Sequence, residues 1–506
     1  MIAKNTTIRV VCLALLLLPA LMFGQSEDYS QYGLGLIYED LLATPGWVQV
    51  QQVDALPGAG LADTVVCVDL TPEMPPVGNQ GQQGSCTAWA VGYYHKTHTE
   101  WLEHGWDVTE REHQFSPAFI YNQINGGVDR GSSFTNAMQL LIDQGGASLA
   151  DMPYRDWDPR VWPSDAAFFN ALPYRAEAMF AIDLSDTSGV NAVRQRLANG
   201  YTSVIGIAVY SNFDNIHEFD NIYTVADRYG SNRGGHAVTI VGYCDTLTTA
   251  DGPGAFRIAN SWGTGWGDAG YFWMSYTAVM DSDLSYRSVA YATDRIGYQP
   301  TLIARFRVAH GSRDKLGMRF VVGSKAMPLL RWELRSWRRA YHDVPFPPND
   351  LVFDLTDAES LIVTGVADSL FLNCFDGNRD GIEGVIEHFS IEDGEGRYIA
   401  RSLDTPLDIP EGNWVGAYAL ISLPLGVSGP EQEVLPGRTA RPVPTIVRGV
   451  LRLPEGRSAL LHDAAGRRVM SLHTGENDIG HLAPGVYFCR MTDIGEKVFR
   501  LVVSGR

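Results

Sequence analysis

The hydrophobic pattern of this chain changes from helical to strand-like at about residue 200. Apolar positions with helical periodicity predict helices at residues 87–104, 117–124, 136–144 and 190–198. Short β-branched or alternating runs predict strands at residues 203–210, 237–243, 256–259 and 271–274. Helices followed by strands within residues 67–297 predict an α+β domain with a helical lobe and a β lobe.

A different pattern begins at residue 298. Short alternating strands separated by polar turns recur at intervals typical of a β-sandwich, which is predicted over residues 298–428. Its role is open: a scaffold, a substrate-binding accessory or a regulator of a cleft. The predicted strands are residues 302–308, 319–322, 351–354 and 370–372.

The last part of the chain opens with a proline-rich stretch, residues 429–447, which predicts a linker. Residues 448–506 predict a second, small β-sandwich. It contains the runs Asp463-Ala-Ala-Gly-Arg-Arg-Val and Leu482-Ala-Pro-Gly-Val-Tyr-Phe. These runs resemble the C-terminal sorting domains of the type IX secretion system, which implies that this machinery is a partner. The alternative is a generic β accessory domain.

The N-terminal residues predict export. Lys4 and Arg9 precede an apolar run, residues 10–18, that is too short to span a bilayer and is followed by small residues. This is the pattern of a signal peptide over residues 1–24, so the protein is expected to be secreted. No other stretch approaches ~18 apolar residues, so no transmembrane segment is expected in the mature chain. Residues 25–66 are interpreted as a pro-segment or an N-terminal extension.

Length and charge narrow the possible partners. A chain of 506 residues is too long for one core and predicts about two to four domains. The formal net charge is −19, or −21 once Lys4 and Arg9 leave with the signal peptide. Such acidity argues against nucleic acid and anionic membranes as partners.

The cysteines also fit an oxidising compartment. An odd number remains after the signal peptide, as expected where one is a free reactive thiol. A bridge between Cys67 and Cys244 is one possibility, and a set of isolated buried thiols is the other. The five are Cys67, Cys86, Cys244, Cys374 and Cys489.

The strongest chemical signal lies in residues 79–90, Asn-Gln-Gly-Gln-Gln-Gly-Ser-Cys-Thr-Ala-Trp-Ala. Cys86 lies in a glycine-rich turn that runs into a predicted helix, where unpaired backbone N–H groups and the helix dipole stabilise a thiolate. Gln80 can direct its amide at an oxygen that becomes negative during acyl transfer. The segment therefore predicts a nucleophile and its oxyanion hole.

A base for this nucleophile is predicted at His236, which follows two glycines at the head of a β-branched strand. Asn260 ends a later strand, in Ala-Asn-Ser-Trp-Gly, and its amide can accept a hydrogen bond from the far nitrogen of the imidazole. Trp262 can shield that bond from water.

These three segments resemble the papain-like cysteine peptidases, whose signature has glutamine, cysteine, histidine and asparagine in this order. The resemblance covers residues 67–297 and implies the two-lobed papain-like fold. It implies Gln80 for the oxyanion, Cys86 as nucleophile, His236 as base, Asn260 as orienting amide and Trp262 as support.

Two positions depart from the usual pattern. The family usually has a cysteine three residues before the nucleophile, bridged to a second one, and here that position is Gln83. A tryptophan usually follows the nucleophile, and here Thr87 does. Neither position has a catalytic role, and both suggest a bacterial branch without the disulfide framework of animal and plant relatives.

The resemblance implies a cysteine endopeptidase that forms a thioester with protein or peptide substrates, without a metal or an organic cofactor. Gly131 and Ser132 are candidate substrate-binding residues, because a small residue lets a peptide lie close to the backbone. The alternative is an ordinary loop that caps the following helix. No paired-histidine insertion of dipeptide-releasing relatives is present, which favours an endopeptidase.

Two other functions stay open at this point. One is a surface-displayed binding protein whose peptidase domain is inactive. The other is a peptide acyltransferase on the same scaffold, although a transglutaminase-like enzyme would more usually orient its histidine with aspartate.

The predicted sandwich contains one further pattern. Asp376, Asn378, Asp380 and Glu387 match the spacing of a calcium-binding loop. The flanks look like strands rather than helices, so a plain turn is the alternative, and calcium binding stays open.

Overall fold

The chain forms two compact units, Met1–Leu423 and Pro424–Arg506. The computed structural model describes residues 28–50, 65–323, 328–341, 343–363, 367–421, 445–447, 450–453, 458–463, 468–479, 481–482, 485–491 and 498–503. The predicted signal peptide and most of the predicted linker lie outside the described residues. None of the described helices is long and apolar enough to cross a membrane.

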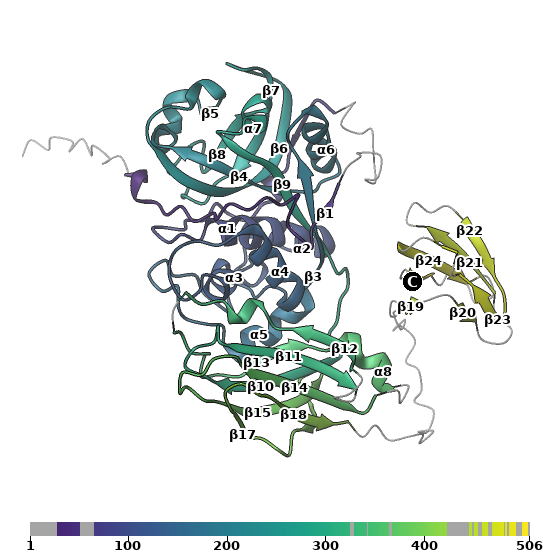
Figure 1. Ribbon diagram of the computed structural model, residues 1–506. Coiled ribbons are helices and arrows are strands. Elements are labelled where there is room, and N and C mark those ends of the chain that lie inside the picture. Colours follow the sequence, from purple (N-terminus) through teal and green to yellow (C-terminus); the bar gives the residue numbers. More distant parts are fainter. Residues whose placement is uncertain are drawn as a thin grey trace, which may run out of the picture. The chain divides into compact units, whose positions relative to one another are not determined.

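The helical lobe of the first unit starts at the predicted nucleophile. Helices α1 (Cys86–Ala88), η5 (Trp89–Lys96) and α2 (Thr97–His104) follow one another without a break, as predicted. Helices α3 (Pro117–Ile124) and α4 (Phe134–Gln144) pack against this run (Figure 1). The hydroxyls of the residues before α3 and α4, both serines, accept hydrogen bonds from the first turn of each helix, which explains where the two helices begin.

The β lobe is built on a nine-stranded sheet with the order β1-β3-β9-β4-β6-β7-β8-β5, in which β2 also pairs with β6. The long strand β6 (Asn232–Thr249) lies between β4 (Ser203–Tyr210) and β7 (Gly252–Ala259) and is antiparallel to both. Apolar residues of these strands share a core with helix α6 (Thr187–Ala198). The other elements are β1 (Val48–Gln49), β2 (Cys67–Asp69), α5 (Asp165–Ala171), β3 (Ala176–Asp183), β5 (Ile222–Tyr223), β8 (Tyr271–Ser275), α7 (Tyr276–Met280) and β9 (Ser285–Asp294).

One disulfide joins the N-terminal strand of this domain to the sheet. Cys67 and Cys244 lie opposite each other across β2 and β6 and are bonded. Cys86, Cys374 and Cys489 are free and buried. Of the two cysteine arrangements that the sequence left open, the structure therefore shows the bridge, and a disulfide is consistent with an extracytoplasmic location.

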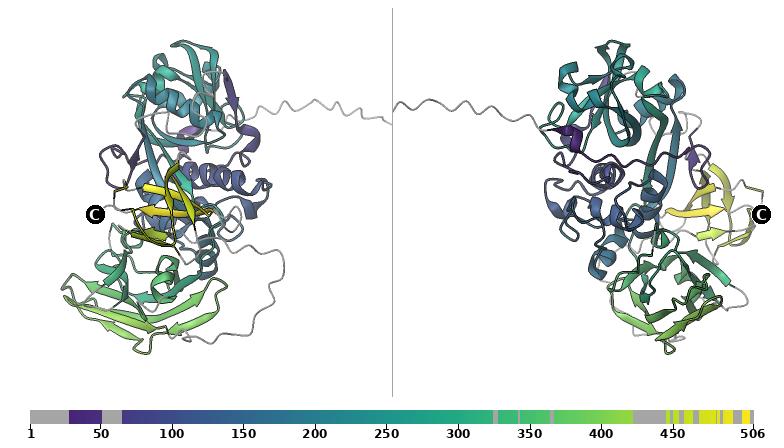
Figure 2. Two further views of the ribbon diagram at one scale, coloured as in Figure 1. Left: turned by 90° about the vertical axis from the view of Figure 1, so that its right-hand side faces the viewer. Right: turned by 60° about the vertical axis from the view of Figure 1, so that its left-hand side comes forward.

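Two further sheets follow the two lobes within the first unit. One has the order β13-β10-β15-β16, with β17 also on β15, and the other β12-β11-β14-β18. Their inner faces pack together, with ring centroids of Phe306 and Phe320 5.2 Å apart, and form the layers visible in Figure 2. The elements are β10 (Leu302–Ala309), β11 (Leu316–Gly323), β12 (Pro328–Glu333), β13 (Leu351–Asp354), α8 (Glu359–Val363), β14 (Ser369–Asp376), β15 (Gly384–Asp393), β16 (Tyr398–Arg401), β17 (Leu407–Ile409) and β18 (Trp414–Leu420).

These sheets are bonded to the helical lobe. Arg175 and Asp354 form a buried ion pair with Nη1 and Oδ2 2.7 Å apart. The indole N–H of Trp337, a fully buried side chain, donates to Oε1 of Gln123 on α3 at 2.9 Å. The helical lobe and these two sheets also share one hydrophobic core.

The second unit contains a five-stranded sheet, β19-β25-β24-β21-β22, and the two-stranded sheet β20-β23. Strand β19 takes the last three residues of the predicted linker. The strands are β19 (Thr445–Val447), β20 (Val450–Leu453), β21 (Ala459–Asp463), β22 (Arg468–Leu472), β23 (Gly475–Asp478), β24 (Gly485–Met491) and β25 (Val498–Val503).

Candidate active site

Cys86 begins helix α1 at the junction of the two lobes, and its side chain is fully buried. Its sulfur lies within hydrogen-bond reach of the backbone N–H groups of Ala237, Gly35 and Thr87. Burial raises the pKa of the thiol, and these N–H groups oppose the rise only in part. Because Ala237 follows His236 in β6, the fold brings the predicted nucleophile beside the strand that carries the predicted base.

His236 and Asn260 are hydrogen-bonded, with Nε2 and Oδ1 2.7 Å apart and both side chains fully buried. Oδ1 of Asn260 also accepts from the N–H of Ser261, which identifies it as the carbonyl oxygen of the amide. Nε2 must therefore carry the proton, and Nδ1 is the unprotonated nitrogen of the neutral imidazole. Among the described residues Nδ1 is buried and has no hydrogen-bond partner.

Trp262 packs against this pair. Its indole is fully buried, and its ring centroid lies 5.1 Å from that of His236. Burial lowers the pKa of His236 to about 4, the bond to Asn260 opposes this, and the charge of Arg233 adds to it. In this buried setting both Cys86 and His236 are therefore biased toward their neutral forms.

Gln80 is oriented by a residue that the sequence reasoning did not assign. The hydroxyl of Ser261 donates to Oε1 of Gln80 at 2.6 Å. The amide nitrogen Nε2 is thereby turned the other way, where it donates to the carbonyls of Gln83 and Gly33 at 2.9 and 2.8 Å. Ser261 lies between Asn260 and Trp262 in the Asn-Ser-Trp-Gly motif, but the sequence alone did not indicate a role for it.

Residues 28–37, here called the strap, run as the purple segment between helices and sheet in Figure 1, along the boundary of the two lobes that is here called the cleft. The N–H of Ser132 donates to the carbonyl of Gly35 at 2.8 Å, and Ile37 donates back to the carbonyl of Ser132 at 3.0 Å. On the other wall, the N–H of Leu36 donates to the carbonyl of Gly235 at 3.2 Å. The strap therefore adds its main chain to both sides of the cleft.

Glycines make this close approach possible. A Cβ atom on Gly33 would lie 2.4 Å from the carbonyl oxygen of Gln82. Gly131 has a positive φ of 88°, and a Cβ atom there would lie 2.0 Å from the carbonyl oxygen of Gly35. The predicted substrate-binding residues Gly131 and Ser132 thus both contact a peptide segment in the structure.

The side chain of Leu36 packs against the β lobe. It is only 8% exposed and lies over Gly206 of β4, beside the ring of Tyr286 of β9. A Cβ atom on Gly206 would be 2.5 Å from both Leu36 and Tyr286.

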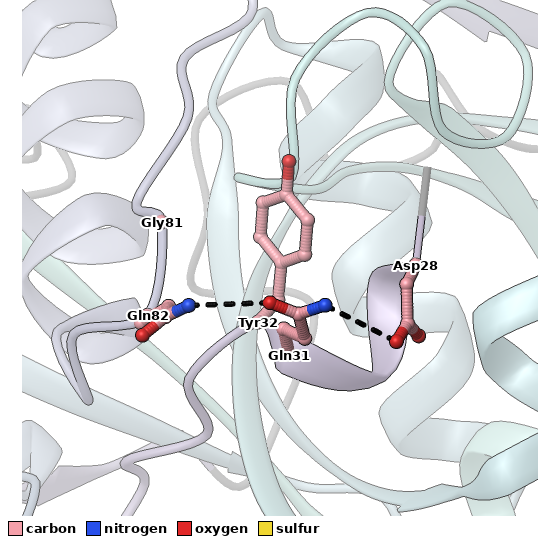
Figure 3. Close-up of a pocket in the computed structure, with 5 residues that line it drawn as sticks. All are labelled: Asp28, Gln31, Tyr32, Gly81 and Gln82. Atoms are coloured by element: carbon pink, nitrogen blue, oxygen red, sulfur yellow. Dashed lines mark hydrogen bonds between the residues drawn. The ribbon is translucent and has the colours of Figure 1, made fainter. Parts of the chain in front are cut away.

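At the opposite end of the strap, a pocket of about 260 Å³ lies between the strap and the loop that precedes Cys86 (Figure 3). Gln82 donates to Gln31, and Gln31 donates to Asp28, across its floor. Tyr32 also lines this pocket, with its ring 5.7 Å from that of Trp262.

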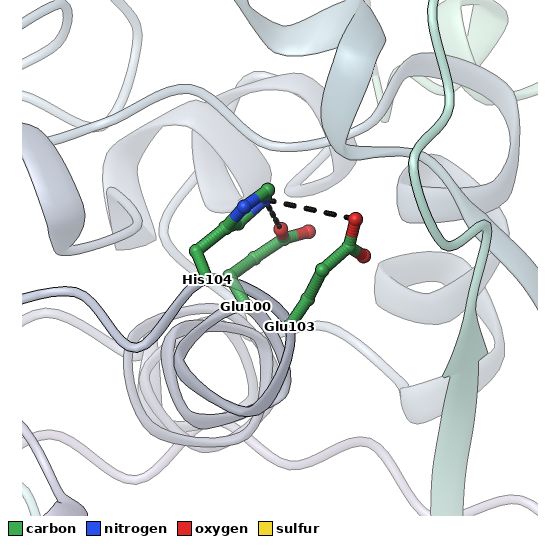
Figure 4. A group of neighbouring side chains, drawn as sticks. All are labelled: Glu100, Glu103 and His104. Atoms are coloured by element: carbon green, nitrogen blue, oxygen red, sulfur yellow. Dashed lines mark ion pairs between the residues drawn. The ribbon is translucent and has the colours of Figure 1, made fainter. Parts of the chain in front are cut away.

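One group of possible metal ligands occurs among the described residues, Glu100, Glu103 and His104 on helix α2 (Figure 4). Glu100 already forms an ion pair with the buried ammonium of Lys96, and His104 Nε2 lies 3.3 Å from Glu100. The side chains therefore form an ion-pair network in which the ammonium of Lys96 provides the positive charge.

The four residues with calcium-like spacing do not form a cluster of possible metal ligands in the described part of the chain. Asp376 is buried and lies 3.2 Å from Nε2 of His310. Oδ1 of Asp376 accepts from the N–H of Asn378, and Oδ1 of Asp380 from that of Ile382, as in turns. Glu387 lies on β15, near Arg307. Calcium binding there stays a hypothesis that these contacts do not support.

Comparison with known proteins identifies the domain that contains this site. Residues 68–290 match the papain family of cysteine proteases. This segment is therefore a papain-family cysteine protease domain, and its class is that of the cysteine-type peptidases.

Individual relatives match over this domain. An uncharacterized peptidase C1-like protein of Acanthamoeba polyphaga mimivirus is 28% identical over 222 residues, which are 41% of this chain and 66% of that protein. A cathepsin B-like protein of Giardia intestinalis, CP3, is 29% identical over 203 residues, 39% of this chain and 64% of that protein. The chain thus spans just under two thirds of the length of these curated relatives. The structure of xylellain, a cysteine protease from Xylella fastidiosa, is 25% identical and covers 52% of this chain and 96% of that one, with a TM-score of 0.41.

Proposed function

We propose that the protein is a secreted papain-like cysteine endopeptidase that is made as an inactive precursor. The observation that carries this proposal is the buried hydrogen bond between His236 and Asn260, beside a cysteine at a helix N-terminus. The bond leaves the unprotonated Nδ1 of the imidazole available on the other side of the ring.

The chemistry follows from these atoms. Nδ1 of His236 takes the proton of Cys86, and the thiolate attacks a peptide carbonyl. Nε2 of Gln80 and the N–H of Cys86 stabilise the oxyanion. The imidazolium then protonates the leaving amine, and His236 next activates a water molecule that hydrolyses the thioester.

The strap acts as the pro-segment in this proposal. The carbonyl of Gly33 in the strap accepts a hydrogen bond from Nε2 of Gln80, the donor that would otherwise bind the oxyanion. The strap also buries the site, which favours the neutral forms of Cys86 and His236. Its main chain also pairs with Ser132, so no substrate can use that edge. Activity therefore requires that the strap leave the cleft.

The modules around this domain are assigned accordingly. Residues 1–24 are the signal peptide, residues 448–506 serve the type IX secretion machinery, and residues 298–428 support the peptidase domain. The backbone N–H of Tyr341 in the latter region donates to the carbonyl of Gly126 at 3.1 Å, close to the wall that carries Ser132. Mass analysis of the secreted protein tests this, because it must lack residues 1–24, and residues 448–506 if sorting removes them.

The test of the activity compares the wild type with Cys86→Ala on a diverse peptide library under reducing conditions. Hydrolysis by the wild type alone supports the proposal. Ligated products would favour an acyltransferase. Absence of turnover in a wild type freed of its strap would favour a binding protein.

A further inference from the structure

Arg233 binds the N-terminal end of the strap. Its Nη2 donates to the carbonyls of Ser30 and Tyr32 at 2.8 and 3.0 Å, and its Nη1 approaches that of Tyr29 at 3.4 Å. The side chain is only 14% exposed. One guanidinium therefore binds three carbonyls of a single short run of main chain, the 3-10 turn η1 (Tyr29–Gln31) and the residue after it.

The charge of this guanidinium is balanced from the other side. Nη1 of Arg233 also forms an ion pair with Asp214, whose side chain is 10% exposed. The pair fixes the guanidinium on the cleft wall and leaves little net charge there. Such a site suits the neutral carbonyls of a continuing chain better than the carboxylate of a chain end.

The position of Arg233 along the cleft indicates which part of a substrate it would meet. Ser132 pairs with the strap on one side of Cys86, and Arg233 binds it on the other. The guanidinium lies 5.6 Å from the ring centre of Trp262, the indole that packs on His236. His236 gives its proton to the leaving amine, so Trp262 and Arg233 lie on the leaving-group side of the site.

We propose that Arg233, held by Asp214, binds the main-chain carbonyls of the substrate on the leaving-group side, which makes it a specificity-determining residue. Once the strap leaves, the donors of Arg233 lose three carbonyl partners, and the carbonyls of a bound peptide can replace them. The inference rests on the proposed peptidase function and extends it: the preferred substrates continue for several residues beyond the scissile bond.

The test compares two substrates with the same acyl part. One ends in an aminomethylcoumarin directly after the scissile bond, and the other continues for several residues to a C-terminal amide. In Arg233→Ala, kcat/KM for the extended substrate is expected to fall about tenfold more than for the short one, mainly through KM. The matched control is Arg228→Ala, which removes a surface arginine paired with Asp283. Equal falls on both substrates, or no fall beyond that of the control, would overturn the inference.

A second measurement does not depend on peptidase activity. The rate at which a thiol reagent alkylates Cys86 in the full-length protein reports how firmly the strap is held. Arg233→Ala is expected to raise this rate about tenfold over the wild type and Arg228→Ala. An unchanged rate would show that Arg233 does not hold main chain in this cleft. A wild type that is alkylated after strap removal but cleaves nothing would instead refute the proposed function.

Discussion

Gly35 and Gly84 touch through their backbones: a Cβ atom on Gly35 would lie 1.8 Å from the carbonyl oxygen of Gly84. One residue belongs to the strap and the other to the loop that leads into Cys86. Since neither partner is a flexible side chain, the contact has no easy relaxation. The fit of the strap therefore depends on glycine at this position.

Replacing Gly35 by alanine is expected to expel the strap. The added methyl group would overlap the backbone of Gly84, so the closed state loses stability while the domain itself is untouched. The rate of Cys86 alkylation should rise at least about tenfold, and peptide cleavage should begin without a processing step. Gly377→Ala, at an exposed turn, is the control. A Gly35→Ala protein that stays as unreactive as the control would contradict the strap's role.

Replacing Asn260 by alanine is expected to lower kcat about a hundredfold, because the imidazole loses the acceptor that fixes its tautomer and ring orientation. Steady-state kinetics on strap-free protein measure this. Alkylation of Cys86 serves as the check on folding. A variant with unchanged kcat would show that the bond to Asn260 does not orient the base.

Replacing Ser261 by alanine is expected to lower kcat about tenfold with little change in KM. The amide of Gln80 loses the donor that holds its Oε1, so Nε2 is aimed less well at the oxyanion. Gln80→Ala, which removes the donor itself, should cost about a hundredfold or more. If Ser261→Ala changed KM alone, Ser261 would act on substrate binding rather than through Gln80.

Acid is expected to open the cleft. In the closed state burial lowers the pKa of His236 to about 4 from its ordinary 6.5. An open cleft hydrates the imidazole, so between pH 6.5 and 4 the open state binds more protons and the closed state loses stability as the pH falls. The loss amounts to about 1.4 kcal/mol per pH unit at most. Above pH 6.5 His236 contributes no pH dependence.

Cys86 labelling with a pyridyl disulfide, which reacts in acid, measures this opening. Burial also lowers the pKa of His95 to about 3 and of His98 to about 4, so near-ultraviolet circular dichroism must show that the fold persists. His236→Gln removes the titrating group and should flatten the profile. An identical profile in that variant would assign the opening to other groups.

Much of the local structure follows from the sequence pattern alone. The predicted helix 117–124 and strand 203–210 have the observed bounds of α3 and β4. These segments combine clear periodicity with caps or glycine-containing turns, so local rules decide them. The region 298–428 could likewise be anticipated as strands, because β-branched alternation identifies them without knowledge of their partners.

The strap could not be found in this way. Its Gly33-Leu-Gly-Leu run has no periodicity, and its contacts are with Gln80, Ser132 and Gly235, all distant in sequence. The same holds for Arg233, which the sequence shows only as a polar residue at the start of a strand. Contacts of this kind depend on where other segments are placed, which no local pattern encodes.

The sequence by itself determined which chemical groups this protein carries and in what local setting: a cysteine at a helix start, a histidine in a β-branched strand, an asparagine directly after a strand, and a glutamine six residues before the cysteine. Only the tertiary structure decided that these groups are buried beneath the chain's own N-terminal segment, with Cys86 and His236 biased toward neutrality. The physical reason is that identity and periodicity are properties of neighbouring residues, whereas burial, pKa and occupancy of a cleft arise from segments that meet after folding.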